Sequence, residues 1–361
     1  MAQAASPYLG LPARAFWRTG LVEPAYPPPD LFRPRWALDR KDRIVTAGSC
    51  FAQHVGRALR KAGFQVVDTE PAASDPRDLG DRAAEHGYGL YSARYGNIYT
   101  VRQLRQLLAE AQGDLVPADP VWEKDGRFFD ALRPNIEPAG SATHKDVLKA
   151  RKTHLAAVRA AFAQADVFVF TMGLTETWMH KASGQVYPVA PGVLAGTFDP
   201  DQHVLQNFRL AEIRADFEAV LAQLGTINDR LRLLLTVSPV PLTATATGEH
   251  VLVATTHAKS VLRACAGELC ADHPRIDYFP SYEIVTSSKA ADQFFEPNLR
   301  SVSATGVARV MQTFLAAHGQ AAEAAADPSD GAEPADDEAR RAERKAARKA
   351  ARRLERGKTR E

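Results

Sequence analysis

Short apolar runs alternate with amphipathic stretches along most of the chain. Five runs are mostly apolar and rich in valine, isoleucine, leucine or phenylalanine, as is typical of buried strands: 44–47, 64–67, 166–172, 231–238 and 276–279. Between them, apolar residues recur three and four positions apart, which predicts helices. Because strands that alternate with helices favour a parallel sheet, the pattern predicts an α/β fold with a doubly wound parallel sheet flanked by helices.

The first apolar run leads into a predicted helix across a turn of small residues. Gly48, Ser49 and Cys50 form this turn, and the apolar face of the helix then runs from Phe51 to Ala62. In α/β proteins such turns lie at the carboxyl ends of strands, where ligands bind. The first amides of a helix favour negative charge, which stabilises a thiolate or an oxyanion. Ser49 and Cys50 are therefore candidate nucleophiles; the alternative is a serine that caps the helix and a buried cysteine.

Both ends of the chain depart from this pattern. Residues 1–40 are rich in proline and aromatic residues without a regular period. We expect them to form an ordered arm packed on a domain of residues 41–318, and the alternative is an arm that binds a partner. Residues 319–361 are first acidic and rich in alanine, and then basic, so we expect a disordered tail or an isolated helix.

Charge is divided unevenly between the body and this tail. The whole chain has a net charge of +2, but residues 340–361 hold 11 Lys or Arg against 3 Asp or Glu, which leaves −6 on residues 1–339. Nucleic acid or an anionic surface is therefore a candidate partner only for the basic segment 340–360. We expect a solvated tail there, as is usual for a run of like charges.

The remaining composition excludes several classes of protein. No apolar run reaches the length of a membrane span, and the N-terminus lacks the basic and apolar regions of a secretory signal, so we expect a cytoplasmic protein. The three cysteines, Cys50, Cys265 and Cys270, make neither a disulfide framework nor a metal knuckle. Histidines do not occur at metal-ligand spacings. We therefore expect no metal and no cofactor.

The turn and several other segments resemble one family of bacterial proteins. Residues 48–52 read Gly-Ser-Cys-Phe-Ala, the signature from which the GSCFA family takes its name. Segments similar to those shared by the family lie at 6–8, 14–18, 95–99, 173–178 and 259–263, and the resemblance covers about residues 6–316. Because GSCFA proteins are similar in fold to SGNH (GDSL) esterases, the resemblance implies an SGNH-hydrolase-like three-layer sandwich. It implies the fold more directly than the activity.

The resemblance to SGNH enzymes assigns roles to individual residues. The SGNH Gly-Asp-Ser turn, aligned on Gly48, places Cys50 at the nucleophile position and Ser49 one residue before it. The Gly-x-Asn-Asp segment, aligned on Gly173, places Thr175 where the oxyanion-binding asparagine would lie. The same resemblance implies oxyanion binding by the backbone of Gly96 or by its neighbour Asn97, for which a plain structural turn is the alternative.

The base that should activate the nucleophile is missing from its usual place. The SGNH Asp-x-x-His element should fall near residues 298–301, where neither an acid nor a histidine is present. Glu176, which replaces the aspartate of the Gly-x-Asn-Asp segment, is a candidate base or orienting group. His257 is a substitute base if its loop folds over the sheet, and His54 follows Cys50 on the same helix. A cysteine partly deprotonated by helix amides needs a weaker base than a serine.

Three functions follow from these residues. The first is an SGNH-like acyl-ester hydrolase or acyltransferase that acts through Cys50 or Ser49 on a small-molecule or glycan ester. The second is a catalytically silent binding module for a glycan or related ligand, because the Asp-x-x-His element is absent. In the third, the basic tail is the main functional element and the globular body is a scaffold.

Overall fold

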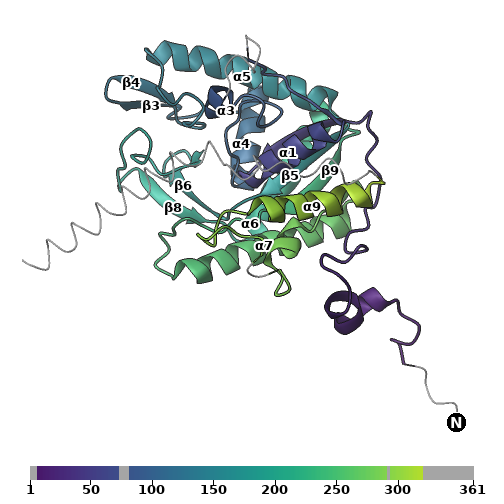
Figure 1. Cartoon of the computed structure of the whole chain (residues 1–361). Coiled ribbons are helices and arrows are strands. Elements are labelled where there is room, and N and C mark those ends of the chain that lie inside the picture. Colours follow the sequence, from purple (N-terminus) through teal and green to yellow (C-terminus); the bar gives the residue numbers. More distant parts are fainter. Residues whose placement is uncertain (1–5, 73–80, 291–292, 320–361) are drawn as a thin grey trace, which may run out of the picture.

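The structure is a computed structural model that describes residues 6–72, 81–290 and 293–319 (Figure 1). The expected acidic and basic tail beyond Gly319 lies outside the described residues, so its role stays a prediction. No helix in the described ranges combines the length and apolar character that a membrane crossing requires.

A five-stranded parallel sheet forms the centre of the molecule. Its strand order is β10-β9-β5-β1-β2. The strands are β1 (Arg43–Gly48), β2 (Gln65–Val66), β5 (Val167–Met172), β9 (Arg232–Val237) and β10 (Ile276–Tyr278). From β1 the chain first moves to one edge and then returns past β1 to the other, so the order reverses between β1 and β5. In doubly wound folds this switch point is where ligands bind.

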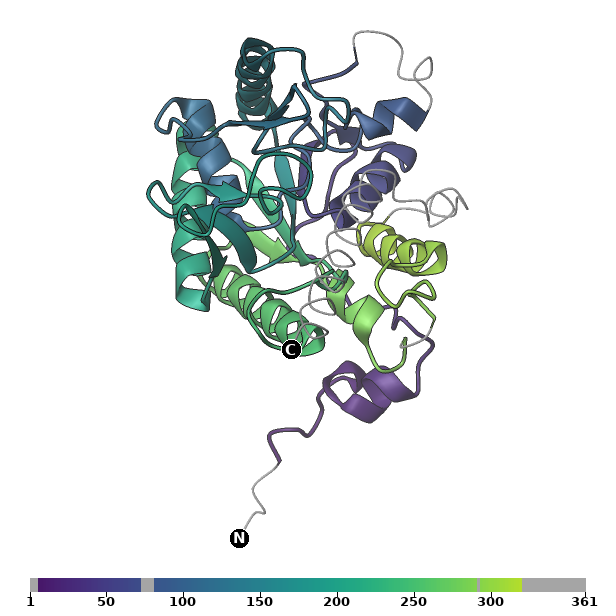
Figure 2. The ribbon, with the colours of Figure 1, turned by 90° about the vertical axis from the view of Figure 1, so that its left-hand side faces the viewer.

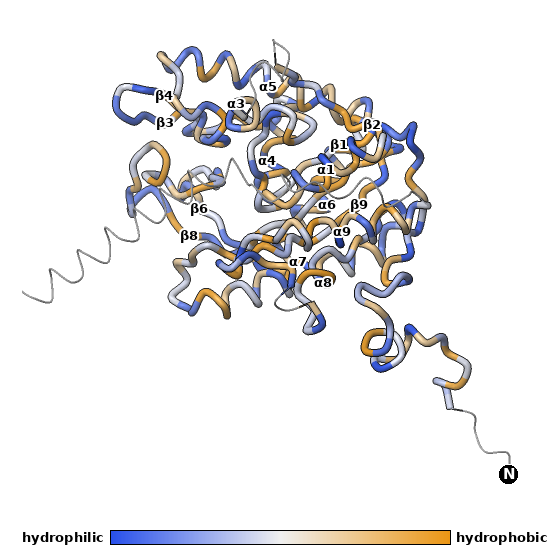
Figure 3. The backbone as a smooth tube through the Cα atoms, viewed as in Figure 1, coloured by the Kyte–Doolittle hydropathy of each residue, from blue (hydrophilic) through white to orange (hydrophobic). Residues whose placement is uncertain are grey.

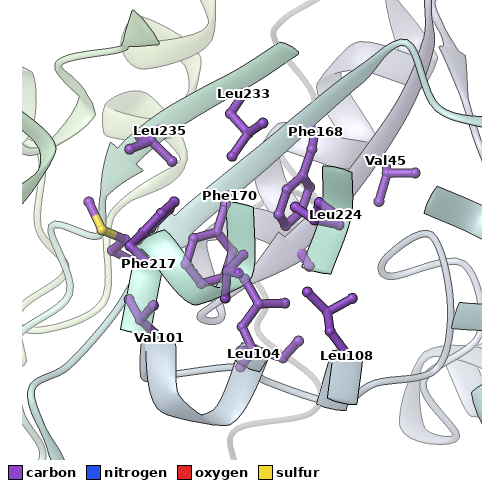
Figure 4. Packing of buried hydrophobic residues seen from close by; sticks show 14 of the residues in the cluster. Val45, Val101, Leu104, Leu108, Phe168, Phe170, Phe217, Leu224, Leu233 and Leu235 are labelled. Carbon is purple, nitrogen blue, oxygen red and sulfur yellow. The ribbon is translucent and has the colours of Figure 1, made fainter. Parts of the chain in front are cut away.

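Helices cover both faces of this sheet, which confirms the three-layer α/β prediction. Alternate residues of a strand point to opposite faces. Phe168 and Phe170 accordingly pack with residues of α4 to α7, whereas Val167 and Val169 pack with α1 and α9. Figure 4 shows the first of these clusters. The helices are α1 (Phe51–Lys61), α3 (Asp81–Glu85), α4 (Val101–Gln112), α5 (His144–Gln164), α6 (Leu210–Ile227), α7 (Val251–Asp272), α8 (Ser281–Thr286) and α9 (Ala304–Ala317).

Two smaller antiparallel units are added to this frame. The strands β3 (Val121–Lys124) and β4 (Arg127–Asp130) form a hairpin whose tip is exposed and hydrophilic (Figure 3). The strands β6 (Glu176–His180), β7 (Val186–Tyr187) and β8 (His203–Asn207) form a sheet in the order β7-β6-β8. The sequence pattern did not predict this second sheet, because its strands are short and carry polar and apolar residues together.

The N-terminal arm divides into two parts. In residues 26–40, the Tyr26 hydroxyl donates to a backbone carbonyl of α8 at 2.6 Å, and further side chains pack into the core beside α9. The two single turns before it, η1 (Ala13–Ala15) and η2 (Arg18–Val22), contain no buried residue and lie away from the sheet (Figures 1 and 2). The first part still touches the domain, since Lys289 Nζ donates to the carbonyls of Leu21 and Val22 at 2.9 and 2.8 Å.

A glycine allows the backbones of β1 and β5 to approach at the switch point. Gly48 has a φ of 139°, and a β-carbon there would collide with the carbonyl oxygen of Thr171 and lie 2.8 Å from its nitrogen. The next amide, that of Ser49, donates to the same carbonyl at 3.1 Å. Only glycine meets both conditions without strain.

We expect Gly48→Ala to lower the free energy of unfolding by about 3 kcal/mol or more, because the new methyl group meets immobile backbone atoms as well as backbone strain. Gly113→Ala is the matched control, since Gly113 also has a positive φ but open space around it. Backbone strain alone should cost that variant about 1 to 2 kcal/mol. Urea denaturation measures both, and equal losses would contradict the steric argument.

Candidate functional site

A cavity of about 350 Å³ lies at the switch point of the central sheet. Ser49 and Cys50 line it after β1, Gly173 after β5 and Ser238 after β9, so three adjacent strands direct their carboxyl ends toward it. The β7-β6-β8 sheet and residues 240–246 form its other walls. The volume is within the range of small-molecule sites.

Cys50 stands at the N-terminus of α1, on the wall of the cavity. It is the N-cap residue, with φ −51° and ψ −33°, and no capping side chain binds the first amides of this helix. Only 4% of Cys50 is exposed, and the exposed part faces the cavity. The Ser49 hydroxyl is buried and has no hydrogen-bond partner among the described residues. The expected alternative of a serine cap therefore differs from the structure, because Cys50 occupies that position.

Lys259 also lies in this site, although the sequence analysis did not name it as a candidate catalytic residue. It lies on α7 with 1% of its surface exposed, and its Nζ donates to the carbonyl of Gly173 at 2.7 Å. Burial lowers the pKa of Lys259 to about 7; the charge of Cys50 opposes this shift and that of Arg300 adds to it. A lysine with this pKa is partly neutral near neutral pH, so it can accept a proton. The only signal in the sequence was its place at the start of the family-like segment 259–263, because helical spacing alone does not predict burial of a lysine.

Arg300 occupies the region where the Asp-x-x-His element was expected. The Asn298 side chain accepts hydrogen bonds from the amides of Arg300 and Ser301, at 2.9 Å each, and Leu299 between them has a φ of 52°. This turn places Arg300 on the wall of the cavity. A guanidinium thus lies where the resemblance to SGNH enzymes led us to expect a base, and it cannot itself accept a proton.

Glu176 lines the cavity from the first position of β6. Both its carboxylate oxygens accept from the Thr245 hydroxyl at 2.9 Å. Burial raises the pKa of Glu176, while the hydrogen bonds from Thr245 and from the Ala246 amide oppose the rise. The carboxylate is therefore held by the segment after β9 and stands apart from the hydrogen bond of Lys259.

The two histidines considered as bases do not line the cavity. His257 is exposed on α7, and it reaches the site only through the effect of its charge on Glu176. His54 is buried in α1, where its Nδ1 lies 3.1 Å from Arg57. Burial lowers the pKa of His54 to about 3. Neither histidine replaces the missing base.

The residues expected to bind an oxyanion are arranged differently from the SGNH pattern. Gly96, Asn97 and Thr175 do not line the cavity. Asn97 instead donates to the hydroxyl of Tyr99 at 2.9 Å, and Tyr99 does line it. The amide of Gly173 donates to the Tyr99 carbonyl at 3.2 Å, and the carbonyl of Gly173 accepts from Lys259. Residues 95–99 thus support the walls of the site.

Among the residues that the structure describes, no group of three or more His, Cys, Asp or Glu side chains is arranged to hold a metal ion. The polar groups that line the cavity include a thiol, an amine, a guanidinium, a carboxylate and several hydroxyls. They provide a nucleophile, a base and positive charge, which is the set that acyl transfer requires.

Lys259→Met tests the buried amine through its effect on stability. The native pKa of about 7 lies below the ordinary 10.5, so between these values the unfolded chain binds more protons and native stability rises with pH. We expect wild type to gain up to about 1.4 kcal/mol per pH unit above pH 7 relative to the variant, and nothing below it. Urea denaturation between pH 6 and 9 measures this difference.

The exposed Lys152 on α5 supplies the control for this experiment. Lys152→Met should leave the dependence of stability on pH unchanged. A Lys259→Met variant that follows the wild-type pH dependence would show that the amine keeps its ordinary pKa.

Comparison with known proteins gives one match. The model described as the GSCFA family matches residues 43–314, from β1 through most of α9. No curated protein and no solved structure matches this chain. The matched residues include all those that line the cavity.

Proposed function

This chain belongs to the GSCFA family, and from that premise we propose that it transfers acyl groups through a thioester on Cys50, with Lys259 as general base. The observation that carries the proposal is the buried amine of Lys259, which lies in the same cavity as the Cys50 thiol and responds to its charge. A nucleophile paired with a base is the signature of covalent catalysis.

The reaction proceeds in two stages. Lys259 Nζ takes the thiol proton as Cys50 Sγ attacks the acyl carbon of an ester or thioester. The tetrahedral intermediate then collapses, and the leaving alcohol or thiol receives that proton. In the second stage water or an acceptor alcohol loses its proton to Lys259 and attacks the thioester, which frees the Cys50 thiol and the product.

The surroundings of Cys50 support stabilisation of the oxyanion. The amides of Ala52 and Gln53 donate to the carbonyls of Ser49 and Cys50 at 2.8 and 3.1 Å, so this support comes from the dipole of α1, whose N-terminus favours negative charge. Arg300 adds a positive charge on the same cavity wall. These two groups take the role that the SGNH resemblance gave to Gly96, Asn97 and Thr175.

Cys50 is a better nucleophile here than Ser49 because of the base that is present. A thiol is far more acidic than a hydroxyl, so the partly neutral amine of Lys259 accepts a proton from it more readily. A serine hydroxyl is far less acidic and needs a stronger, well-aligned base. The Ser49 hydroxyl has no hydrogen-bond partner among the described side chains and backbone groups.

The first test is alkylation of the three cysteines by iodoacetamide, followed by mass spectrometry. We expect Cys50 to react faster in wild type than in Lys259→Met, because the amine accepts the proton of the attacking thiol. Cys270 is an internal control, because burial raises its pKa to about 11 and it should react slowly. Equal rates at Cys50 and Cys270 would contradict the pairing.

The second test is turnover of p-nitrophenyl butyrate. We expect Cys50→Ala and Lys259→Met each to lower kcat/KM by about 10²-fold or more, because each removes a group used in proton transfer. Ser49→Ala and the control Lys152→Met should retain most of the activity. Rapid mixing should show a burst of p-nitrophenol and a thioester on Cys50. Undiminished turnover in Cys50→Ala would overturn the proposal.

A second candidate is a binding module that holds a glycan or related ligand without turnover. It is favoured by residues 298–301, which lack the acid and the histidine of SGNH enzymes, and by the unpartnered Ser49 hydroxyl among the described residues. In that case the alkylation rate of Cys50 would still fall in Lys259→Met. Ester hydrolysis would not exceed the uncatalysed rate.

A further inference from the structure

An aromatic and aliphatic row forms one wall of the cavity. On the β7-β6-β8 sheet, Trp178 is opposite Tyr187 on one side and Leu205 on the other. Residues opposite each other in antiparallel strands point to the same face, and all three line the cavity. Glu176 lies two residues before Trp178, so the row continues about 7 Å along the strand beyond the carboxylate.

This row is fixed in place by packing behind it. The rings of Trp178 and Phe198 meet edge to face, with centroids 5.0 Å apart, and Tyr187 lies 5.0 Å from Trp122. A wall supported in this way keeps its shape when a ligand binds, which lowers the cost of binding.

The facing walls are also apolar. Val240, Pro241 and Leu242 follow β9, and Val189 and Val193 belong to the connection between β7 and β8. Beyond the polar end at Cys50, Lys259, Arg300 and Glu176, the cavity thus offers mainly hydrocarbon and aromatic surface.

Two of the hydroxyls in these walls are already engaged. Thr177 donates to the Tyr187 carbonyl at 2.8 Å, and Thr245 donates to Glu176. A sugar ring carries a hydroxyl on most carbons, and each hydroxyl buried without a partner costs free energy. A hydrocarbon chain gains free energy from the same surface.

We infer that the cavity binds an apolar acyl chain of medium length, with its carbonyl carbon at Cys50 and its tail along Trp178 and Leu205. The inference deepens the proposed function by naming the acyl group, and it rests on that function for the direction of the carbonyl. The sequence analysis suggested a carbohydrate ester as substrate. In this arrangement the carbohydrate is the leaving group or the acceptor, and it lies outside the apolar walls.

The test measures binding without turnover. Isothermal titration of Cys50→Ala with acetate, butanoate, hexanoate and octanoate should show Kd falling about fourfold per added methylene until the walls are filled. Glucose and N-acetylglucosamine are the polar comparators and should bind no better than acetate. Binding that is undetectable, independent of chain length or tightest for a sugar would overturn the inference.

Two variants test whether the acyl chain lies along the row of Trp178 and Leu205. In the Cys50→Ala background, Leu205→Trp should shorten the preferred acid and remove the gain for octanoate while leaving acetate binding unchanged. Leu252→Trp is the matched control, because Leu252 lies at the exposed start of α7 and 66% of it is accessible. Val193→Phe repeats the test from the opposite wall if Leu205→Trp does not fold. An unaltered length preference in both cavity variants would also overturn the inference.

Failure of this inference can be distinguished from failure of the proposed function. Turnover that depends on Cys50, together with flat binding of the acids, would leave the acyl transfer standing and reject the apolar acyl pocket. Graded binding without turnover would keep the pocket and support a module that holds acyl chains.

Discussion

The close approach of two backbones at the switch point is the constraint on which the site depends. Gly48 brings β1 against Thr171 of β5, and the Ser49 amide then bonds to the Thr171 carbonyl. The chain therefore turns into α1 directly beside the end of β5. The carbonyl of Gly48 also accepts from Ile98 at 2.8 Å, which ties residues 95–99 to the same turn. These contacts hold the end of β1, the end of β5 and residues 95–99 together. Cys50, Gly173 and Tyr99 therefore line one cavity.

A buried amine gives this cavity its chemical character. Among the described residues the Lys259 amine donates to the Gly173 carbonyl alone, and it lies in a low-dielectric setting that disfavours its charge. A structural role alone would be served as well by an uncharged side chain. Strongly shifted lysines are concentrated at functional sites, since a base with a pKa near neutrality is what proton transfer needs. The proposed mechanism uses this property directly.

The arrangement of groups departs from the SGNH pattern in one consistent way. In the proposed mechanism Cys50 keeps the nucleophile position after β1, Lys259 of α7 accepts the proton, and Arg300 of the last loop stands where a base was expected. A thiol tolerates this exchange, because its acidity is close to that of a desolvated lysine. The β7-β6-β8 sheet lines the cavity largely with apolar side chains, which is the surface that the proposed substrate would meet.

The sequence by itself determined the α/β class, the buried strands and the turn with Cys50, because periodicity and small residues act over a few neighbouring positions. It also indicated the absence of the usual Asp-x-x-His element at residues 298–301. Only the tertiary structure placed the buried Lys259 amine in the same cavity as Cys50 and left His257 and Gly96 outside the cavity lining. These outcomes depend on which faces of distant elements pack together and on which side chains that packing buries. The spacing of residues along the chain does not determine either.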